Sequence, residues 1–199
     1  MFLFSKNAYS SLTDEGLMLY VSEGKEKAFT ELYHRYAKRM LYFFYQRLYQ
    51  DEQKAQDFLQ DLFLKVLQKP QLFDGNKKFK TWLYTLAINM CKNEYRKDAV
   101  RGVKVNDFDF NEVEEIQTPF IFPDKFDKDL FAANLKHELN NMEENQRITF
   151  LLRYNEDLSI NEISEILGCA EGTVKSRLFY CTKKLAVKLR AFNPKNELE

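Results

Sequence analysis

Basic and aromatic side chains are interleaved in one stretch, Gly172 to Lys184, written GTVKSRLFYCTKK. No acidic residue occurs between Gly172 and Lys195, although the 30 basic and 30 acidic residues of the whole chain balance to a formal net charge of +0. Cationic side chains bind phosphate oxygens, whereas hydroxyl and aromatic groups contact base edges in the major groove. A basic helix alone favours an ordinary solvated face, and the prediction of a DNA-binding helix depends on the capping box and turn that precede it.

Helical periodicity divides this stretch into two faces. At 100° per residue, Val174, Leu178, Cys181 and Leu185 share one apolar face, which is expected to pack inward. The opposite face and its flanks supply the candidate DNA-binding side chains, which are Thr173, Lys175, Ser176, Arg177, Phe179, Tyr180 and Lys183.

A short helix is expected before this one. Ser159 and Glu162 have the spacing of a capping box, and Leu167-Gly168 is a typical helix end. After a three-residue turn, Glu171 begins the long helix, which is expected to reach about Ala191 and to pack on Ile160, Ile163 and Leu167. The pattern predicts a helix-turn-helix domain.

A second candidate surface for nucleic acid lies on the helix expected over residues 79–96. Its buried stripe is predicted to be Phe79, Leu83, Leu86 and Met90, with Trp82 at the edge. Amide and cationic groups beside an aromatic ring suit single-stranded nucleic acid, because bases stack and phosphates are neutralised. The candidate residues, including those of the preceding basic loop, are Asn76, Lys77, Lys78, Trp82, Thr85, Asn89, Lys92 and Arg96.

The helix expected over residues 51–67 carries an acidic outer face. Phe58, Leu59, Leu62, Phe63 and Val66 are predicted to point inward. Asp57, Gln60, Asp61 and Leu64 are predicted to point outward, where an exposed leucine among acids suits a basic helix of a partner protein.

The residues give little support for enzyme or metal chemistry. Asp57 and Asp61, one helical turn apart, could bind Mg²⁺ in a nucleic-acid enzyme, but no histidine lies near them. The three cysteines, Cys91, Cys169 and Cys181, have no metal-ligand spacing, and an odd number without a framework indicates a reducing compartment. We therefore predict a protein that is not an enzyme, with no cofactor and no small-molecule substrate.

Composition and charge predict an all-α fold of two small helical domains joined by a flexible acidic linker. Six glycines and four prolines supply little turn material for an all-β fold. Residues 100–129 lose the helical period and contain eight acidic residues. The predicted divisions are residues 1–99, the linker 100–129, and the helix-turn-helix domain 130–199. The N-terminal apolar run is too short for a signal peptide and no later run could span a membrane, so we expect a cytoplasmic protein without membrane insertion.

Several long segments, in order, resemble the extracytoplasmic-function (ECF) group of bacterial RNA polymerase sigma factors. They are AFTELYHRYAKRMLYFFYQRL, DFLQDLFLKVLQKPQLFD, FKTWLYTLAINMCKNEYRK and RITFLLRYNEDLSINEISEILGCAEGTVKSRLFYCTKKL. The resemblance covers residues 25–98 and 135–190. Two residues depart from the family pattern. Ala170 stands where Ser or another good N-cap is usual, and Tyr180 stands where a basic residue is common.

The resemblance implies a role for each surface. Asp57, Gln60, Asp61 and Leu64 would dock on the clamp helices of the polymerase β′ subunit, and the β flap is a further implied contact of core polymerase. The loop 74–78 and the face of Thr85, Asn89 and Lys92 would engage the melted minus-ten element. The face around Arg177 would read the minus-thirty-five element, the linker would pass through polymerase, and an anti-sigma factor is an expected partner.

Two other functional classes are compatible with parts of the sequence. A free-standing repressor or activator would use the same helix-turn-helix, but no dimerisation helix is evident and the first block would have no role. A resolvase-like recombinase or a nuclease would use the carboxylates of Asp57 and Asp61. The sequence, however, has no serine nucleophile in a suitable context. A promoter-specificity subunit is the function that accounts for both blocks.

Overall fold

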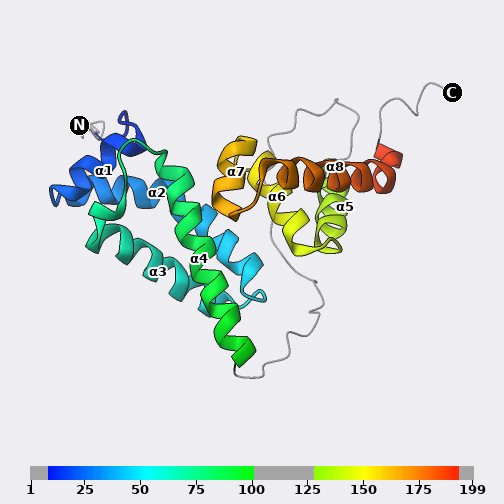
Figure 1. Ribbon diagram of the computed structural model, residues 1–199, viewed down its shortest axis with the longest axis horizontal. Helices are drawn as coiled ribbons and strands as arrows, with labels where there is room; N and C mark the ends of the chain where they lie inside the picture. The colour runs from blue at the N-terminus through cyan, green and yellow to red at the C-terminus, as the bar shows by residue number, and fades with distance from the viewer. Residues whose placement is uncertain (1–8, 101–127, 193–199) are drawn as a thin grey trace, which may run out of the picture. The chain divides into compact units, whose positions relative to one another are not determined.

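The computed structural model describes residues 9–100 and 128–192, and every regular element in these two ranges is helical. The chain divides into two compact units, of which one contains residues 9–100 and the other residues 128–192 (Figure 1). The predicted all-α, two-domain fold is confirmed. Most of the predicted acidic linker, residues 101–127, lies outside the described residues, and the predicted domain boundaries remain a prediction.

The first unit consists of α1 (Asp14–Ser22), α2 (Glu26–Arg47), α3 (Glu52–Gln68), the 3₁₀ turn η1 (Pro70–Leu72) and α4 (Phe79–Val100). Side chains fix two of the helix starts. The Thr13 hydroxyl accepts a hydrogen bond from Gly16 N at 3.1 Å, and the Asp51 carboxylate accepts one from Lys54 N at 2.9 Å. Both are N-caps that satisfy donors left free in the first helical turn.

More of the surface of α4 is buried in the first unit than a single apolar stripe predicts. Phe79, Leu83 and Met90 are buried as expected, but Leu86 is only half-buried, so its placement in the buried stripe was wrong. α4 contacts α1, α2 and α3, so a wide arc of its surface is covered. The buried set therefore also includes Thr81, Tyr84, Ala87, Ile88 and Cys91.

The second unit consists of α5 (Lys128–Asn140), α6 (Glu144–Tyr154), α7 (Ile160–Leu167), α8 (Glu171–Lys188) and the 3₁₀ turn η2 (Arg190–Phe192). The predicted capping box is present: Glu162 N donates to Ser159 Oγ at 3.2 Å, and Ser159 N donates to the Glu162 carboxylate at 2.8 Å. Gly168 ends α7 at φ 66°, a left-handed conformation that suits glycine.

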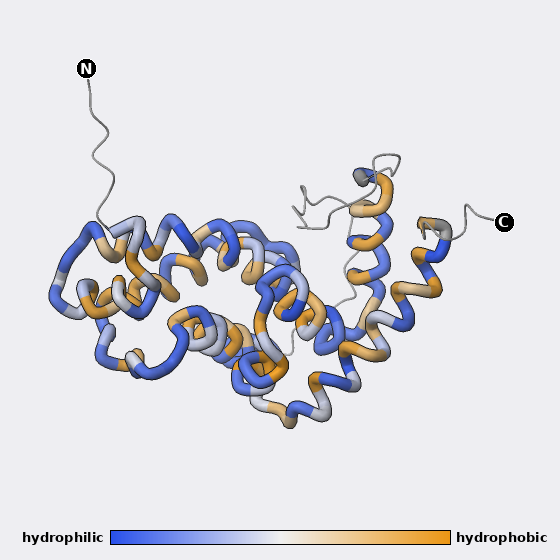
Figure 2. The backbone as a smooth tube through the Cα atoms, turned by 90° about the horizontal axis from the view of Figure 1, so that it is seen from above, coloured by the Kyte–Doolittle hydropathy of each residue, from blue (hydrophilic) through white to orange (hydrophobic). Residues whose placement is uncertain are grey.

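The helix-turn-helix packs as expected, with two corrections. Ile163, Ile166 and Val174 are buried, whereas the predicted contacts Ile160 and Leu167 and the predicted inward residue Leu178 are half-buried. α8 ends at Lys188, three residues before the predicted end, and a 3₁₀ turn follows it. Figure 2 shows apolar and polar residues alternating along the helices, the pattern that lets each bury one face.

One further cluster completes the second unit. Its buried residues are Leu135, Leu139, Met142, Phe150, Cys181 and Leu185. The side of α8 that carries Cys181 and Leu185 is thus anchored on α5 and α6, which leaves the other side to solvent. Among the residues described, no helix is long and apolar enough to cross a membrane.

Candidate nucleic-acid interfaces

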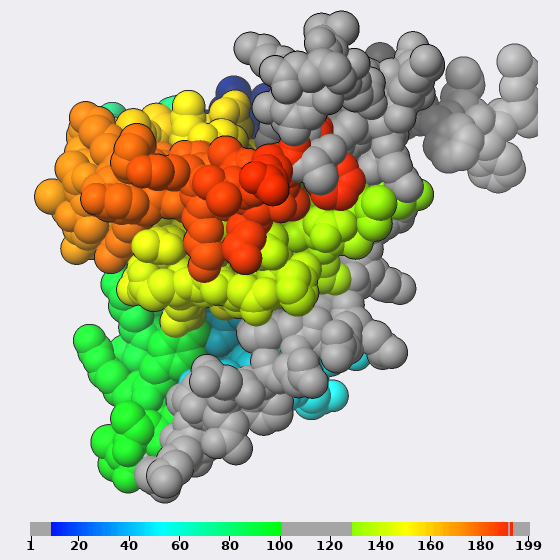
Figure 3. Space-filling model, turned by 90° about the vertical axis from the view of Figure 1, so that its right-hand side faces the viewer, coloured from blue at the N-terminus to red at the C-terminus, as the bar shows by residue number. Residues whose placement is uncertain are grey.

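α8 presents the predicted DNA-binding residues along one accessible side. Figure 3 shows α8, in orange to red, lying across the surface of the second unit beside α5. Lys175, Ser176 and Lys183 are exposed, and Thr173 and Arg177 are half-buried. Because the apolar side is fixed in the core, this polar side is a rigid ridge of the size that enters a major groove.

Several of these side chains are already held by local contacts. Lys175 Nζ lies 3.6 Å from the Glu171 carboxylate, and Ser176 Oγ donates to Thr173 O at 3.0 Å. Arg177 Nη1 donates to Cys169 Sγ at 3.7 Å, so its guanidinium leans toward the turn between α7 and α8. The Lys175 pair is exposed and exchangeable for phosphate, whereas Arg177 also supports the turn.

Two aromatic side chains on α8 are exposed. Phe179 is 59% exposed and Tyr180 is 60% exposed, and their rings meet edge to face at 5.4 Å. Lys183 Nζ lies 6.0 Å from the centroid of the Phe179 ring. An exposed aromatic pair beside a cation can contact base methyl groups while the cation binds a phosphate.

The inner side of α8 is fixed by contacts with the α5–α6 connection. Lys184 Nζ donates to Asn141 O at 3.3 Å, and the Cys181 thiol donates to Met142 Sδ at 3.2 Å. Burial raises the pKa of the Cys181 thiol to about 11. Cys181 is therefore a neutral core residue, and the described ranges contain no group of three His, Cys, Asp or Glu placed to hold a metal ion.

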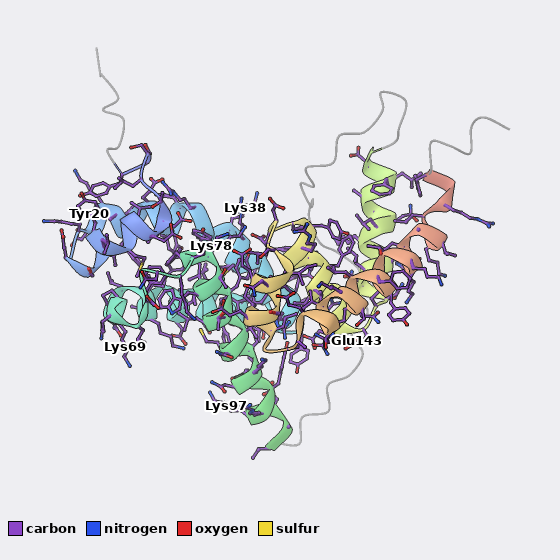
Figure 4. The ribbon with its side chains drawn as sticks, turned by 45° about the horizontal axis from the view of Figure 1, so that its top comes forward. Tyr20, Lys38, Lys69, Lys78, Lys97 and Glu143 are labelled. Atoms are coloured by element: carbon purple, nitrogen blue, oxygen red, sulfur yellow. The ribbon has the colours of Figure 1, made fainter. Side chains whose placement is uncertain are left out.

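The second predicted surface is formed by the start of α4 and the loop before it. Asn76, Lys77 and Lys78 are exposed, and the loop is a tight turn because Asn76 N donates to Asp74 Oδ1 at 3.0 Å and Lys77 N to Asp74 O at 2.9 Å. In Figure 4, Lys78 lies at the end of α4 that joins this loop. The exposed Asn89, Lys92 and Arg96 continue along the helix.

Trp82 and Thr85 lie between the core and this surface. Trp82 is half-buried, with its ring centroid 5.3 Å from that of Phe73 and 5.8 Å from that of Phe79. Thr85 Oγ1 donates to Thr81 O at 2.8 Å, so its hydroxyl oxygen keeps free acceptor capacity. The tryptophan is thus half-buried and packs on core rings from the edge of the buried stripe, where the sequence placed it.

The acidic face of α3 has the predicted composition. Asp57, Gln60, Asp61 and Leu64 are all exposed, and Gln53 Nε2 donates to the Asp57 carboxylate at 3.3 Å. Leu67, one turn beyond Leu64, is 43% exposed and extends the apolar strip. Leu67 was not singled out from the sequence, although its spacing of three residues from Leu64 was a usable signal.

Buried polar groups anchor the far half of α4. Lys54 Nζ of α3 lies 2.9 Å from the Glu94 carboxylate and 3.6 Å from that of Asp98, and both acids are largely buried. Burial alone would lower the pKa of Lys54, but the two carboxylates outweigh it and raise that pKa. None of these three residues was singled out from the sequence, because the pairing joins positions 40 or more apart.

A polar network fastens α1 to α2. Arg35 Nη1 donates to Asp14 Oδ1 at 2.8 Å and to Leu12 O at 2.9 Å, and Tyr36 donates its hydroxyl to the other Asp14 oxygen. Burial opposes the charge of Arg35, but the bonds to Asp14 and Glu31 raise its pKa. Burial, reinforced by Asp14, raises the pKa of Tyr36. These residues hold the N-terminal helix against the domain.

Comparison with known proteins assigns both units. The profile of sigma-70 region 2 matches residues 32–101, and that of sigma-70 region 4 matches residues 132–180. The RNA polymerase sigma-H factor of Pseudomonas aeruginosa is 31% identical over 171 residues, which cover 83% of this chain and 88% of that protein. The ECF RNA polymerase sigma-E factor of Haemophilus influenzae is 27% identical over 191 residues, covering 90% and 96%.

A solved structure shares the fold. The sigma factor RpoE of Bartonella quintana, solved in complex with the anti-sigma factor NepR, aligns with a TM-score of 0.63 at 23% identity. The alignment covers 84% of this chain and 99% of that one.

Together the fold and the surfaces define a two-domain, all-α protein whose second domain is a helix-turn-helix. The sequence matches are more specific. The chain belongs to the RNA polymerase sigma factors, in the ECF group, a family of non-catalytic transcription initiation factors. The family resemblance predicted from the sequence is confirmed.

Proposed function

We propose that this chain binds core RNA polymerase and directs it to promoters that carry two separate elements. The observation that carries the proposal is the exposure of three chemically different surfaces on the family's two domains: an acidic face on α3, a basic and amide-rich face on α4 with its loop, and a basic-aromatic ridge on α8. Each surface suits a different partner.

The α8 ridge reads the duplex minus-thirty-five element. Lys175 and Lys183 bind phosphates, while Ser176, Phe179 and Tyr180 contact base edges in the major groove. Arg177 and Thr173 flank this set at the start of the helix.

The α4 surface binds the minus-ten element after its strands separate. The loop residues Asn76, Lys77 and Lys78 bind the backbone and an extruded non-template base, and the half-buried Trp82 ring contacts the strand beside them. Thr85, Asn89, Lys92 and Arg96 extend the path of the single strand along the helix.

The acidic α3 face docks on the clamp helices of the polymerase β′ subunit. Asp57 and Asp61 offer charges for a basic helix, and Leu64 supplies the apolar anchor at the centre. The β flap is the second contact of core polymerase.

Two domains on a linker suit the separation of the promoter elements. Elements roughly 25 base pairs apart are about 85 Å from each other along B-DNA, well beyond one domain of about 100 residues, whose radius of gyration is near 13 Å. We place the domains at residues 1–99 and 130–199, joined by the acidic residues 100–129. Once polymerase holds both domains, each binds its element at high effective concentration.

The proposed cellular setting follows from the partners. The chain acts in the cytoplasm, where RNA polymerase is found. An anti-sigma factor is a proposed inhibitor, by extension from the complex in which the Bartonella quintana relative was solved.

Run-off transcription tests the proposal. Purified core polymerase of the source organism should start at defined sites on genomic templates only when this chain is added. The variant Asp61→Lys should lose core binding while keeping its circular dichroism spectrum, whereas Glu165→Lys, an equal charge change on α7, should bind normally. Absence of any promoter-dependent start with the wild-type chain would overturn the proposal.

A further inference from the structure

The N-terminal helix α1 has no part in the surfaces described so far. It lies before residue 32, where the match to sigma-70 region 2 begins. Yet α1 contacts α2, α4 and η1, and its Leu17, Met18 and Val21 are buried. It is therefore an integral part of the first domain, and the question is what it holds in place.

One bond joins α1 directly to the start of α4. The Glu15 carboxylate accepts a hydrogen bond from Phe79 N at 2.9 Å, across 64 positions of sequence. The first N–H groups of a helix have no partner within the helix, and a carboxylate there also meets the positive end of the helix dipole. Lys78, the residue before α4, has a side chain without an acceptor, so Glu15 supplies the cap from another helix.

Glu15 is itself held on a fixed support. Its neighbour Asp14 receives hydrogen bonds from both Arg35 and Tyr36 of α2. The apolar side of α1 is buried directly after it, at Leu17 and Met18. The Glu15 carboxylate therefore reaches Phe79 from a helix that is bonded to α2 at its start and buried along its apolar side.

Phe79 is the point at which the loop 74–78 becomes helix. Its ring is fully buried and contacts Phe73 at 5.8 Å and Trp82 at 5.8 Å between centroids. A cap on its N–H group fixes where α4 begins, and with it the direction in which Lys77 and Lys78 leave the core. The positions of the loop, of Trp82 and of the first turn of α4 thus all depend on Phe79, whose ring is buried and whose N–H group is bonded to Glu15.

We propose that Glu15 is a positioning residue for the surface that binds the melted minus-ten strand, and that α1 acts as a brace for promoter opening. Glu15 does not touch DNA; it acts through Phe79 N. This inference rests on the proposed function of the loop 74–78 and adds to it a residue outside the sigma-70 region 2 match.

Three variants separate this role from general stability. Glu15→Gln keeps a side-chain oxygen that accepts from Phe79 N, and Glu15→Ala removes it. Thr13→Ala is the matched control, because it deletes the N-cap of α1 without touching α4. The measurements are promoter opening, followed by 2-aminopurine fluorescence in the minus-ten element of a duplex, and hydrogen exchange of the Phe79 amide.

We expect Glu15→Ala to slow opening by about three- to tenfold and to speed exchange of the Phe79 amide, whereas Glu15→Gln stays within about twofold of wild type. On a pre-melted template Glu15→Ala should bind core polymerase normally and show a smaller loss than on the duplex, because the strands are already separate and only their capture depends on the loop. Opening by Glu15→Ala at the wild-type rate overturns the inference alone, as does an equal loss in Thr13→Ala or in Glu15→Gln. If the wild-type chain opens no promoter, the proposed function fails and the role of Glu15 with it.

Discussion

The two helices that carry the nucleic-acid surfaces, α4 and α8, are held in different ways. α4 is covered by α1, α2 and α3, and charged groups fix it at both halves: Glu15 at its first N–H group and Lys54 at Glu94 and Asp98. α8 buries only Val174, Cys181 and Leu185 fully, and within the described residues its N-cap, Ala170, makes no side-chain capping bond. Charged contacts with distant residues hold α4 at both halves, whereas α8 is held mainly by its apolar side, with a single lysine bond to Asn141 O beside it.

The difference matches what each surface is proposed to bind. A helix that enters a major groove must protrude, so most residues of α8 are exposed while its apolar side packs on α5, α6 and α7. A surface that captures an extruded base must hold its loop in a defined position before the strands separate, which favours the buried and charged supports of α4. Paired substitutions test whether α4 and α8 differ in this way.

The largest contrast is expected between Phe79→Ala and Phe179→Ala. Phe79 is fully buried, so its truncation should lower the free energy of unfolding of the first unit by about 3–5 kcal/mol. Phe179 is 59% exposed, so the same change should alter stability by less than about 0.5 kcal/mol while weakening duplex binding. Urea-dependent hydrogen exchange, read separately in each unit, measures both. Equal losses of stability would contradict the contrast.

The next contrast concerns two lysines. Lys54→Met removes the lysine shared by two largely buried carboxylates, of which Glu94 also lies 3.6 Å from Lys97 Nζ, and should cost the first unit about 2 kcal/mol. Lys175→Met removes only the exposed pair with Glu171 and should cost about 0.3 kcal/mol, while lowering the salt slope of duplex binding by about one. Denaturant titrations and binding at several salt concentrations test the pair. If Lys175→Met lowered the free energy of unfolding as much as Lys54→Met, the two ion pairs would not differ in burial as assigned.

Two substitutions at helix N-caps should change the stability of the second unit by smaller amounts and in opposite directions. Ala170→Ser adds the acceptor that α8 lacks and should stabilise the second unit by about 1 kcal/mol. Ser159→Ala breaks the capping box of α7 and should destabilise the same unit by about 1 kcal/mol. Thermal unfolding measures both. If Ala170→Ser brings no gain, some other group already satisfies the first turn of α8.

The smallest effect is a pH dependence in the second unit. The Cys181 thiol has a pKa of about 11 in the fold, so its contribution to stability is complete below its ordinary pKa near 9 and is lost as the pH rises toward 11. At pH 9 the loss should be about 0.4 kcal/mol. Cys181→Ala should abolish this part of the pH dependence between pH 8 and 10. If the slope of stability against pH were unchanged in Cys181→Ala, a group other than Cys181 would cause the pH dependence.

Local signals in the sequence predicted much of this fold. The capping box at Ser159 and the helix end at Gly168 are contacts between residues a few positions apart, and both were placed correctly. The outward faces of α3 and α8 follow from periodicity alone, because each helix packs on one side.

Contacts between distant residues were not predictable from one sequence. The Glu15–Phe79 bond and the Lys54 cluster join residues of different helices, and nothing in their local sequence marks them as partners. The same reason explains Leu86: periodicity assumes a single buried face, whereas three helices cover α4. Roles of the site residues come from the family resemblance and stay predictions until measured.

Run-off transcription on templates with one promoter element randomised at a time tests the central claim most directly. The wild-type chain should select one preferred sequence at each element. A Phe179→Ala, Tyr180→Ala variant of α8 should relax selection at the minus-thirty-five element only, and an Asn76→Ala, Lys78→Ala variant at the minus-ten element only. If either variant relaxes selection at both elements or at neither, the division of promoter reading between α8 and α4 is wrong.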